Sequence, residues 1–222
     1  MAADDIWNVG QALFGSHSHR SPNRLIRTSL THPLQIATVP VGKNGGRIGL
    51  TLCPGKVDRT SPGGPWERDL QADVAALRDW KASSVLTLLE AHEFDLLKVR
   101  GLPDAVRDAG MAWHHAPIPD VSTPGPAFEA AWRTIGPRIA AELRHGQSVV
   151  LHCRGGLGRA GMIAAMLVII MGEDPRRAIE RVRAARLGAI ETPAQEAYVQ
   201  WIGGLPGNKS HPINNAPATT SE

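Results

Sequence analysis

The segment from His152 to Arg159, HCRGGLGR, gathers a thiol, two arginines and three glycines within eight residues. Glycines adopt backbone angles that let successive amide N–H groups turn inward, and a helix starting at the end of the segment adds its partial positive charge. The sequence therefore predicts an anion-binding loop between Cys153 and Arg159. Its lining is expected to be the backbone of Arg154, Gly155, Gly156, Leu157 and Gly158.

Cys153 and Arg159 are the two side chains of this segment that could do chemistry. A thiol beside a cation and a helix N-terminus is expected to be ionised at neutral pH, which makes Cys153 a candidate nucleophile. The planar fork of Arg159 can bind two oxygens of a phosphate and follow its charge during phosphoryl transfer. Together the two residues predict attack on a phosphate ester, and His152 is expected to support the loop from beneath.

Two other interpretations of the segment are open. Cys153 could be a buried core cysteine in an ordinary strand-to-helix turn, although such a turn needs no pair of arginines. Residues 156–161 also fit the G-x-G-x-x-G pattern of dinucleotide-binding sites. That pattern requires a second strand with an acidic residue about twenty positions further on, whereas this chain continues with the charged, helix-like EDPRRAIERVRAARL. Both interpretations are therefore disfavoured.

A thiolate that displaces an alkoxide or phenoxide needs a proton donor for the leaving oxygen. Asp120 is the sole carboxylate between Ala109 and Phe128, and it follows a predicted strand that ends at Ile118. Loops that leave the carboxyl ends of parallel strands gather at one edge of the sheet, so Asp120 and Cys153 are expected to face each other. The alternative role for Asp120 is that of a residue capping a turn.

The rest of the chain alternates strand-like and helix-like patterns, which could hold such a loop. Strands are predicted at 34–41, 48–53, 84–90, 111–118 and 148–151, and helices at 93–110, 159–171, 174–187 and 192–202. A further helix carries Leu70, Val74, Leu77 and Trp80 on one face. The predicted fold class is α/β: a single domain with a largely parallel central sheet, flanked by helices on both faces.

One predicted helix contains a proline. Thr123 is the expected N-cap and Pro124 the expected first-turn residue of a helix that reaches Leu143. Pro137 is expected to kink or split this helix, because proline removes a backbone donor and crowds the preceding turn.

The composition of the chain indicates where the domain begins and ends and which partners are expected. Residues 1–32 are interpreted as an arm, 33–202 as the domain and 203–222 as a disordered tail. The balance of 24 basic and 21 acidic residues, a net charge of +3, makes a nucleic-acid partner unlikely by bulk charge. We expect no signal peptide and no membrane partner, so the two cysteines predict reduced thiols in a cytoplasmic protein.

The chain resembles the cysteine-based dual-specificity protein phosphatases, and more narrowly the kinase-associated phosphatase type, over residues 33–202. The resemblance rests on HCRGGLGR, on His114-His115 leading to Pro-Ile-Pro-Asp at 117–120, and on GAIETPAQ at 188–195. It implies a protein tyrosine phosphatase-like fold and a phosphocysteine intermediate on Cys153, with Arg159 binding the phosphoryl group. It further implies that Asp120 acts as acid and then as base, that Gln195 helps to place the hydrolytic water, and that no metal or organic cofactor takes part.

The substrate implied by the resemblance is a phosphorylated protein, dephosphorylated on tyrosine and on serine or threonine. Tyr198 is the sole tyrosine, so the loop that stacks a phosphotyrosine ring in tyrosine-specific relatives is missing and a shallow pocket is expected. Phosphoinositide or RNA 5′-phosphate hydrolysis stays open, because Arg154 and the arginines of 176–186 could attract a second phosphate. Leu157, however, stands where the resemblance would place a lysine in an inositide enzyme.

The residue after the loop arginine departs from the family, which usually carries serine or threonine there. Its hydroxyl would hydrogen-bond the sulfur, whereas this chain has Ala160. Slow breakdown of the intermediate is therefore expected, and a weakly active phosphoprotein-binding module is an alternative function. Cys53 is expected to be a small buried residue, and a reversible disulfide between Cys53 and Cys153 is a hypothesis.

Overall fold

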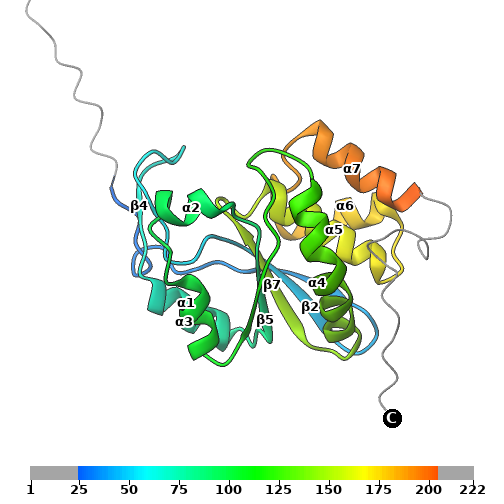
Figure 1. The fold of residues 1–222 in the computed structure, drawn as a ribbon, viewed down its shortest axis with the longest axis horizontal. Coiled ribbons are helices and arrows are strands. Elements are labelled where there is room, and N and C mark those ends of the chain that lie inside the picture. Colours follow the sequence, from blue (N-terminus) through cyan, green and yellow to red (C-terminus); the bar gives the residue numbers. More distant parts are fainter. Residues whose placement is uncertain (1–24, 205–222) are drawn as a thin grey trace, which may run out of the picture.

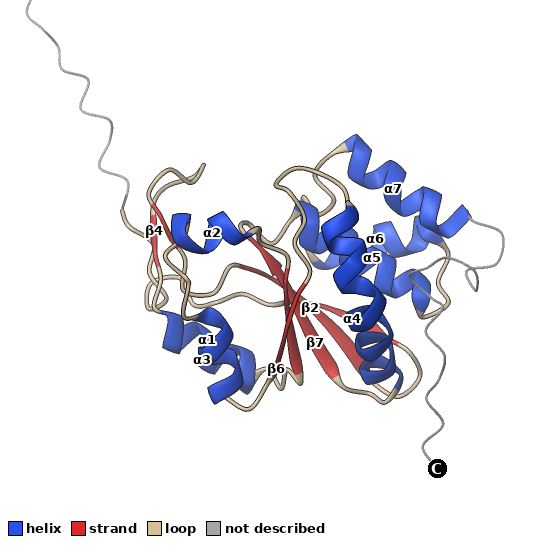
Figure 2. Ribbon diagram, viewed as in Figure 1, coloured by secondary structure: helices blue, strands red, loops and turns tan. Residues whose placement is uncertain are grey.

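A five-stranded sheet forms the centre of the molecule in the computed structural model, which describes residues 25–204 (Figures 1 and 2). Its strands follow the order β1-β2-β7-β5-β6. β1 is antiparallel to β2, and the other three neighbouring pairs are parallel. The bounds of the strands are Ala37–Val41 for β1, Gly46–Leu52 for β2, Ser84–Thr87 for β5, Ala112–His115 for β6 and Ser148–Cys153 for β7. The predicted largely parallel sheet is confirmed.

The middle strand, β7, ends at Cys153, and all of its residues are buried. Leu52 of β2 lies opposite Cys153, and Thr87 of β5 lies opposite His152. A parallel strand with neighbours on both edges and helices on both faces is shielded from water throughout, so its continuous apolar sequence fits this position. The sheet therefore fixes Cys153 at its carboxyl edge.

Helices cover both faces of the sheet, as predicted (Figure 2). One apolar cluster joins the sheet to α1 (Leu70–Asp79) and α3 (Leu102–Asp108), with α2 (Ala91–Leu96) beside them. A second cluster joins the other face to α4 (Pro126–Arg144), α5 (Gly158–Ile170), α6 (Pro175–Ala185) and α7 (Pro193–Gly204). In α5 all residues but the last are buried, so the helix that follows the loop is held firmly on every side.

The predicted split of the long helix at Pro137 is wrong, because α4 continues through it. Side chains before and after the proline, Phe128 and Trp132 on one side and Ile139 and Leu143 on the other, are buried on the same face. This packing outweighs the one backbone hydrogen bond that proline removes. The helix also begins later than predicted, at Pro126 with Gly125 as its N-cap.

Other element bounds also differ from the pattern. The single helix predicted at 93–110 is two helices, α2 and α3, separated by a turn in which Lys98 has a φ of 58°. The run 84–90 is a strand only to Thr87. A small hairpin of β3 (Val57–Asp58) and β4 (Trp66–Glu67) was not predicted, since two-residue strands leave no periodic pattern.

The chain ends lie largely outside the described residues, which exclude 1–24 and 205–222. The described part of the predicted arm contacts the domain. The backbone of Arg27 forms an isolated β-bridge with Trp66, and the Ser29 hydroxyl donates to Asp73 at 2.8 Å. At the other end, α7 extends to Gly204. Among the helices of residues 25–204, none is both long enough and apolar enough to span a membrane.

Candidate active site

The loop from Cys153 to Arg159 wraps around the cysteine sulfur. The Gly156 N–H donates to Cys153 Sγ at 3.3 Å, and Cys153 is 3% exposed. Gly156 has a φ of +70°, and a Cβ there would overlap the Thr51 carbonyl, so this turn requires glycine. The sulfur therefore lies at the floor of the predicted loop, where the Gly156 N–H is directed to it.

Two cations hold the outer side of this loop. Arg186 donates from Nε to the Gly156 carbonyl at 2.7 Å and from Nη2 to the Gly155 carbonyl at 3.1 Å. Lys56 Nζ donates to the Arg154 carbonyl at 3.1 Å. Since these carbonyls point outward, the amide groups between them are turned inward, and those of Gly155 and Leu157 donate to no acceptor within the described chain. The loop is thus a nest for an anion.

Arg159 is almost completely buried, and Glu93 of α2 holds it with two hydrogen bonds. Nη1 donates to Glu93 Oε2 at 2.6 Å and Nη2 to Oε1 at 2.9 Å. Burial by itself lowers the pKa of Arg159, but the bonds to Glu93 and the nearby charges raise it on balance. For Glu93, burial raises the pKa, and the Arg159 bond and the Glu90 N–H lower it on balance. Both partners are therefore charged at neutral pH.

The pattern of the sequence did not single out Glu93. It follows β5, one of the two strands that pair with β7. Its carboxylate also accepts from the Glu90 N–H at 2.8 Å, which forms a capping box at the start of α2. An acidic residue three positions after another acidic residue signals this cap, but it does not indicate a partner sixty-six residues away.

Asp120 lies at the loop as predicted. Its Oδ1 is 2.8 Å from Arg159 Nη2, and its side chain is 48% exposed. The residue follows β6, and the next residue, Val121, has a φ of 60°, which is an uncommon conformation for a β-branched side chain. The carboxyl edges of β6 and β7 thus bring an accessible carboxyl group to the loop arginine.

The Nε of Arg159, on the remaining edge of the guanidinium, faces no acceptor within residues 25–204. Nη1 also donates to the Ile118 carbonyl at 3.0 Å, whereas Nε has no hydrogen-bond partner among the described residues. Glu93 and the strand-end carbonyls therefore fix one side of the fork. The opposite edge consists of Nε and of the Nη2 that contacts Asp120. Such an edge has the geometry to bind two oxygens of a phosphoryl group, with Asp120 at one of the two positions in this structure.

Gln195 is fully buried and links two loops at the site. Its Nε2 donates to the Ser122 carbonyl at 3.1 Å, and its Oε1 accepts from the Glu191 N–H at 3.0 Å. The side chain lies against Gly158, where an added Cβ would meet both amide atoms. The predicted proximity of Gln195 to the loop is found, with the Asp120 loop on one side of it and Glu191 on the other.

Glu191 is a second acidic residue that the sequence analysis missed. Its Oε2 accepts from the Gly158 N–H at 2.8 Å, although the residue itself is exposed. Glu191 lay inside the matched segment GAIETPAQ, but no spacing rule connects it to a glycine thirty-three residues earlier.

His152 supports the loop from beneath, as expected. It is completely buried, and its Nε2 lies 2.7 Å from Thr87 Oγ1. Trp113 Nε1 of β6 donates to the same hydroxyl at 2.9 Å, so Thr87 joins the His152 ring to the edge strand. Burial lowers the pKa of His152 to about 3, so the ring is neutral at neutral pH and is only a weak base.

The arginines that could have attracted a second phosphate are largely paired. Arg154 Nε donates to the buried Asp58 at 3.1 Å, and this bond raises the pKa of Arg154. Arg181 pairs with Glu173 at 2.8 Å, and Arg183 with Glu196 at 2.7 Å. Arg186 holds the loop carbonyls, as described above. The binding role predicted for Arg154 therefore falls to its backbone, because Asp58 holds its guanidinium.

Cys53 is buried, as expected, and burial raises the pKa of its thiol. It follows Leu52, the residue that lies opposite Cys153 in the sheet. Both cysteines are free thiols. The reversible disulfide between them stays a prediction.

Comparisons with known proteins agree with this geometry. A family model described as "Polymorphic toxin system, DSP-PTPase phosphatase" matches residues 62–173. The cyclin-dependent kinase inhibitor 3 of Rattus norvegicus is 30% identical over 173 residues, which cover 75% of this chain and 77% of that protein. The Homo sapiens protein of the same name is 30% identical over 135 residues, covering 60% and 62%.

Solved structures show the same fold. A kinase associated phosphatase whose catalytic-site cysteine is replaced by serine has a TM-score of 0.65 and 26% identity, covering 75% of this chain and 92% of that chain. Tk-PTP in its active form has a TM-score of 0.56 and 23% identity, covering 77% and 98%, and supports the fold alone. The predicted protein tyrosine phosphatase-like fold and the predicted resemblance are confirmed.

Replacing Glu93 by Gln leaves the buried Arg159 charge without its main counter-charge. We expect the free energy of unfolding at pH 7 to fall by about 3 kcal/mol in chemical denaturation. Because the pKa of Glu93 is lowered in the folded state, its stabilisation is complete above the ordinary carboxyl value and is lost as the pH falls through the lower, folded value. The difference from the unmodified protein should therefore shrink below about pH 4. Glu180→Gln, at an exposed position of α6, is the control, and equal losses in both variants would contradict the pairing.

Because His152 is buried and neutral in the folded chain, the free energy of unfolding should decrease as the pH falls. The unfolded chain binds a proton below about pH 6.5, whereas the folded chain does not bind it until about pH 3, so stability decreases as the pH falls through this window. The free energy of unfolding should decrease by about 1.4 kcal/mol more per pH unit between pH 6 and 4 in the unmodified protein than in His152→Asn. Identical slopes for the two proteins would mean that burial does not lower the pKa of His152 in the folded state.

Proposed function

Because the chain belongs to the DSP-PTPase phosphatases, we propose that it hydrolyses phosphoesters of tyrosine and of serine or threonine in protein substrates, through a phosphocysteine intermediate on Cys153. The observation that carries this proposal is the convergence of three groups on one loop. Cys153 Sγ accepts a loop N–H, Arg159 presents a fixed guanidinium edge, and Asp120 contacts that edge at 2.8 Å.

In the first step, the Cys153 thiolate attacks phosphorus. The S–P bond forms as the bond from phosphorus to the leaving oxygen breaks, and the Asp120 carboxyl group gives its proton to that oxygen. Inward-facing loop amides and the free edge of Arg159 bind the equatorial phosphoryl oxygens, where charge is spread in the transition state. Asp120 is placed for the donor role because its accessible carboxyl group lies beside the arginine that would bind the phosphoryl group.

In the second step, the Asp120 carboxylate accepts a proton from water, whose oxygen attacks phosphorus. The S–P bond breaks, inorganic phosphate leaves, and the Cys153 thiolate is regenerated. We assign Gln195 to this step as the residue that positions the water. Its buried amide is fixed between Ser122 and Glu191, beside the loop and on the side of Asp120, which supports this assignment.

The charges around the loop support phosphoprotein substrates over substrates with several phosphates. An inositide or an RNA end would require free cations beside the loop, whereas the guanidinium of Arg154 is paired with Asp58 and Arg186 binds loop carbonyls. Tyr198, the sole tyrosine, is partly buried in α7, and burial raises its pKa to about 12. No tyrosine therefore stacks on a substrate ring, which agrees with dual specificity. We propose a cytoplasmic setting, where both thiols stay reduced.

Release of phosphate from aryl phosphates tests this function. Cys153→Ser should reduce kcat at least about a thousandfold, since a hydroxyl in place of the thiolate is a poor nucleophile. Asp120→Ala should reduce kcat about a hundredfold or more for phenyl phosphate, and much less for an activated nitrophenyl ester whose leaving group needs no proton. Turnover that is indifferent to Cys153 would overturn the mechanism, and phosphate binding without turnover would favour the phosphoprotein-binding module.

Ala160 should make the second step slow. It is fully buried at the start of α5, where the resemblance places a hydroxyl directed to the sulfur. Rapid-mixing kinetics with nitrophenyl phosphate should show a burst of leaving group equal to the enzyme concentration, followed by slower turnover. In Ala160→Ser the burst should disappear and kcat should rise about tenfold, the value of one hydrogen bond to a charged group. A protein that shows no burst would contradict this role of Ala160.

A further inference from the structure

The Glu191 carboxylate occupies one of the amide donors of the anion-binding loop. Its Oε2 accepts from the Gly158 N–H at 2.8 Å, and an added Cβ on Gly158 would overlap that oxygen. Gly158 directly precedes Arg159 in the chain, so this donor belongs to the same loop as the arginine that the proposed function assigns to the phosphoryl group. A carboxylate oxygen on a loop amide makes the type of contact that a phosphoryl oxygen would make there.

The backbone that carries Glu191 is held in an uncommon conformation. Ile190 has a φ of 61°, a region in which a β-branched residue costs about 1–3 kcal/mol. Its N–H donates to the Leu157 carbonyl at 3.4 Å, and its carbonyl accepts from Arg183 Nη2 at 3.2 Å. The same Nη2 pairs with Glu196 of α7. Several bonds therefore hold a strained residue in place directly before the carboxylate.

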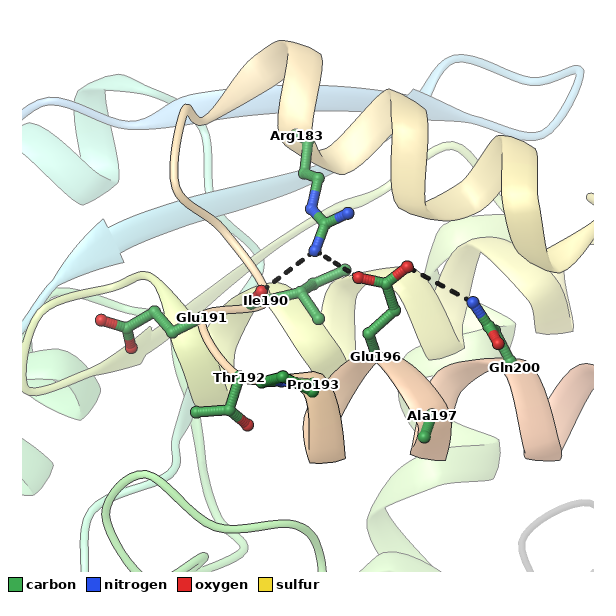
Figure 3. Close-up of a pocket in the computed structure, with 8 residues that line it drawn as sticks. All are labelled: Arg183, Ile190, Glu191, Thr192, Pro193, Glu196, Ala197 and Gln200. Carbon is green, nitrogen blue, oxygen red and sulfur yellow. Dashed lines mark hydrogen bonds and ion pairs between the residues drawn. The ribbon is translucent and has the colours of Figure 1, made fainter.

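Figure 3 shows the consequence for the direction of the side chain. The Arg183 guanidinium, the Ile190 carbonyl and Glu196 form a hydrogen-bonded group beside a cavity of about 370 Å³, and the Glu191 side chain points away from this group. The charge of Arg183 is thus paired with that of Glu196 in the wall of the cavity. Glu191 is directed to the loop instead, where its partner is Gly158.

Glu191 is also coupled to the loop of the proposed acid. Gln195 accepts from the Glu191 N–H and donates to the Ser122 carbonyl, two residues after Asp120. Val121, between them, has a φ of 60°. Each of the two acidic side chains at the loop therefore has a β-branched neighbour with positive φ, and one buried amide joins their backbones.

We propose that Glu191 sets the affinity of the site for phosphoryl groups by acting as an internal competitor. This inference rests on the proposed function. A bound phosphoryl group takes the Gly158 N–H, and the Glu191 carboxylate must leave it and move into water. The exposure of Glu191 permits this movement. While it stays near the loop, its negative charge also opposes the incoming phosphate.

A purely structural role makes a different prediction. Gly158 is the first residue of α5, and Leu157, its N-cap, provides no side-chain hydrogen bond, so Glu191 could serve merely as a cap for the helix. Loss of a cap lowers stability and leaves the affinity for phosphate unchanged. Loss of a competitor raises the affinity, whatever happens to stability.

Binding of inorganic phosphate, measured by titration calorimetry at pH 7, separates the two roles. The measurement uses the full chain carrying Cys153→Ser, alone and with Glu191→Gln, Glu191→Ala or the exposed control Glu180→Gln on α6. We expect both Glu191 variants to bind phosphate about tenfold more tightly, as one hydrogen bond to a charged group implies, and Glu180→Gln to bind unchanged. An unchanged dissociation constant in Glu191→Gln and Glu191→Ala overturns the inference. If Cys153→Ser itself binds no phosphate at millimolar concentration, the proposed function fails first.

Steady-state kinetics with nitrophenyl phosphate, in the chain that retains Cys153, provide a second readout. Competition alone lowers KM in Glu191→Gln by about the same tenfold factor and leaves kcat within about twofold. A large loss of kcat with an unchanged KM would place Glu191 in the chemical steps and overturn the proposal. Thermal unfolding of the same variants identifies a variant that misfolds, and Glu191→Gln, which keeps the size of the side chain, then decides the result.

Discussion

The site depends on the buried guanidinium of Arg159. Its charge must be paired with protein acceptors, while part of the group must stay able to bind an anion. Arg159 is 1% exposed, and an unpaired guanidinium in such a place would be very costly. Glu93 meets this requirement with two hydrogen bonds, and the Ile118 carbonyl adds a third. Because these partners all lie on one side of the fork, they orient the other side toward the loop. The ion pair thus fixes the direction in which the arginine can bind an anion.

This pairing is possible because the sheet is parallel around β7. The loops after β5, β6 and β7 leave the same edge and carry Glu93, Asp120 and the anion-binding loop, respectively. The buried helix α5 then anchors the end of the loop. The C-cap of α6 supplies Arg186 to the outward carbonyls of the loop, and the segment after it supplies Glu191 to the Gly158 N–H. Each chemical group comes from a different connection, so the fold assembles the site while each segment keeps its local structure.

The parts of the site that could be predicted are those encoded locally. Seven consecutive residues define the anion-binding loop, and one strand followed by the only nearby carboxylate defines Asp120. Glu93, Asp58 and Glu191 could not be predicted, because they meet their partners across sixty-six, ninety-six and thirty-three residues. The fold class was predictable from strand and helix alternation. The split predicted at Pro137 was wrong, because local propensity does not include the packing of Phe128 and Leu143 against the sheet.

The same pairings explain how a chain of nearly balanced charge builds a selective anion site. The arginines around the loop are held by Asp58, Glu173, Glu196 and loop carbonyls, so they stabilise structure and add little free positive charge. In the proposed function, attraction for phosphate comes mainly from backbone amides and one edge of Arg159, and it is opposed by the carboxylates of Asp120 and Glu191, which contact Arg159 and the Gly158 N–H. Val121 follows Asp120 and Ile190 precedes Glu191, and both have positive φ, so an uncommon backbone conformation adjoins each carboxylate. Since a phosphoryl group must outcompete these internal anions, the arrangement favours ligands that fill the whole nest over anions that make one or two contacts.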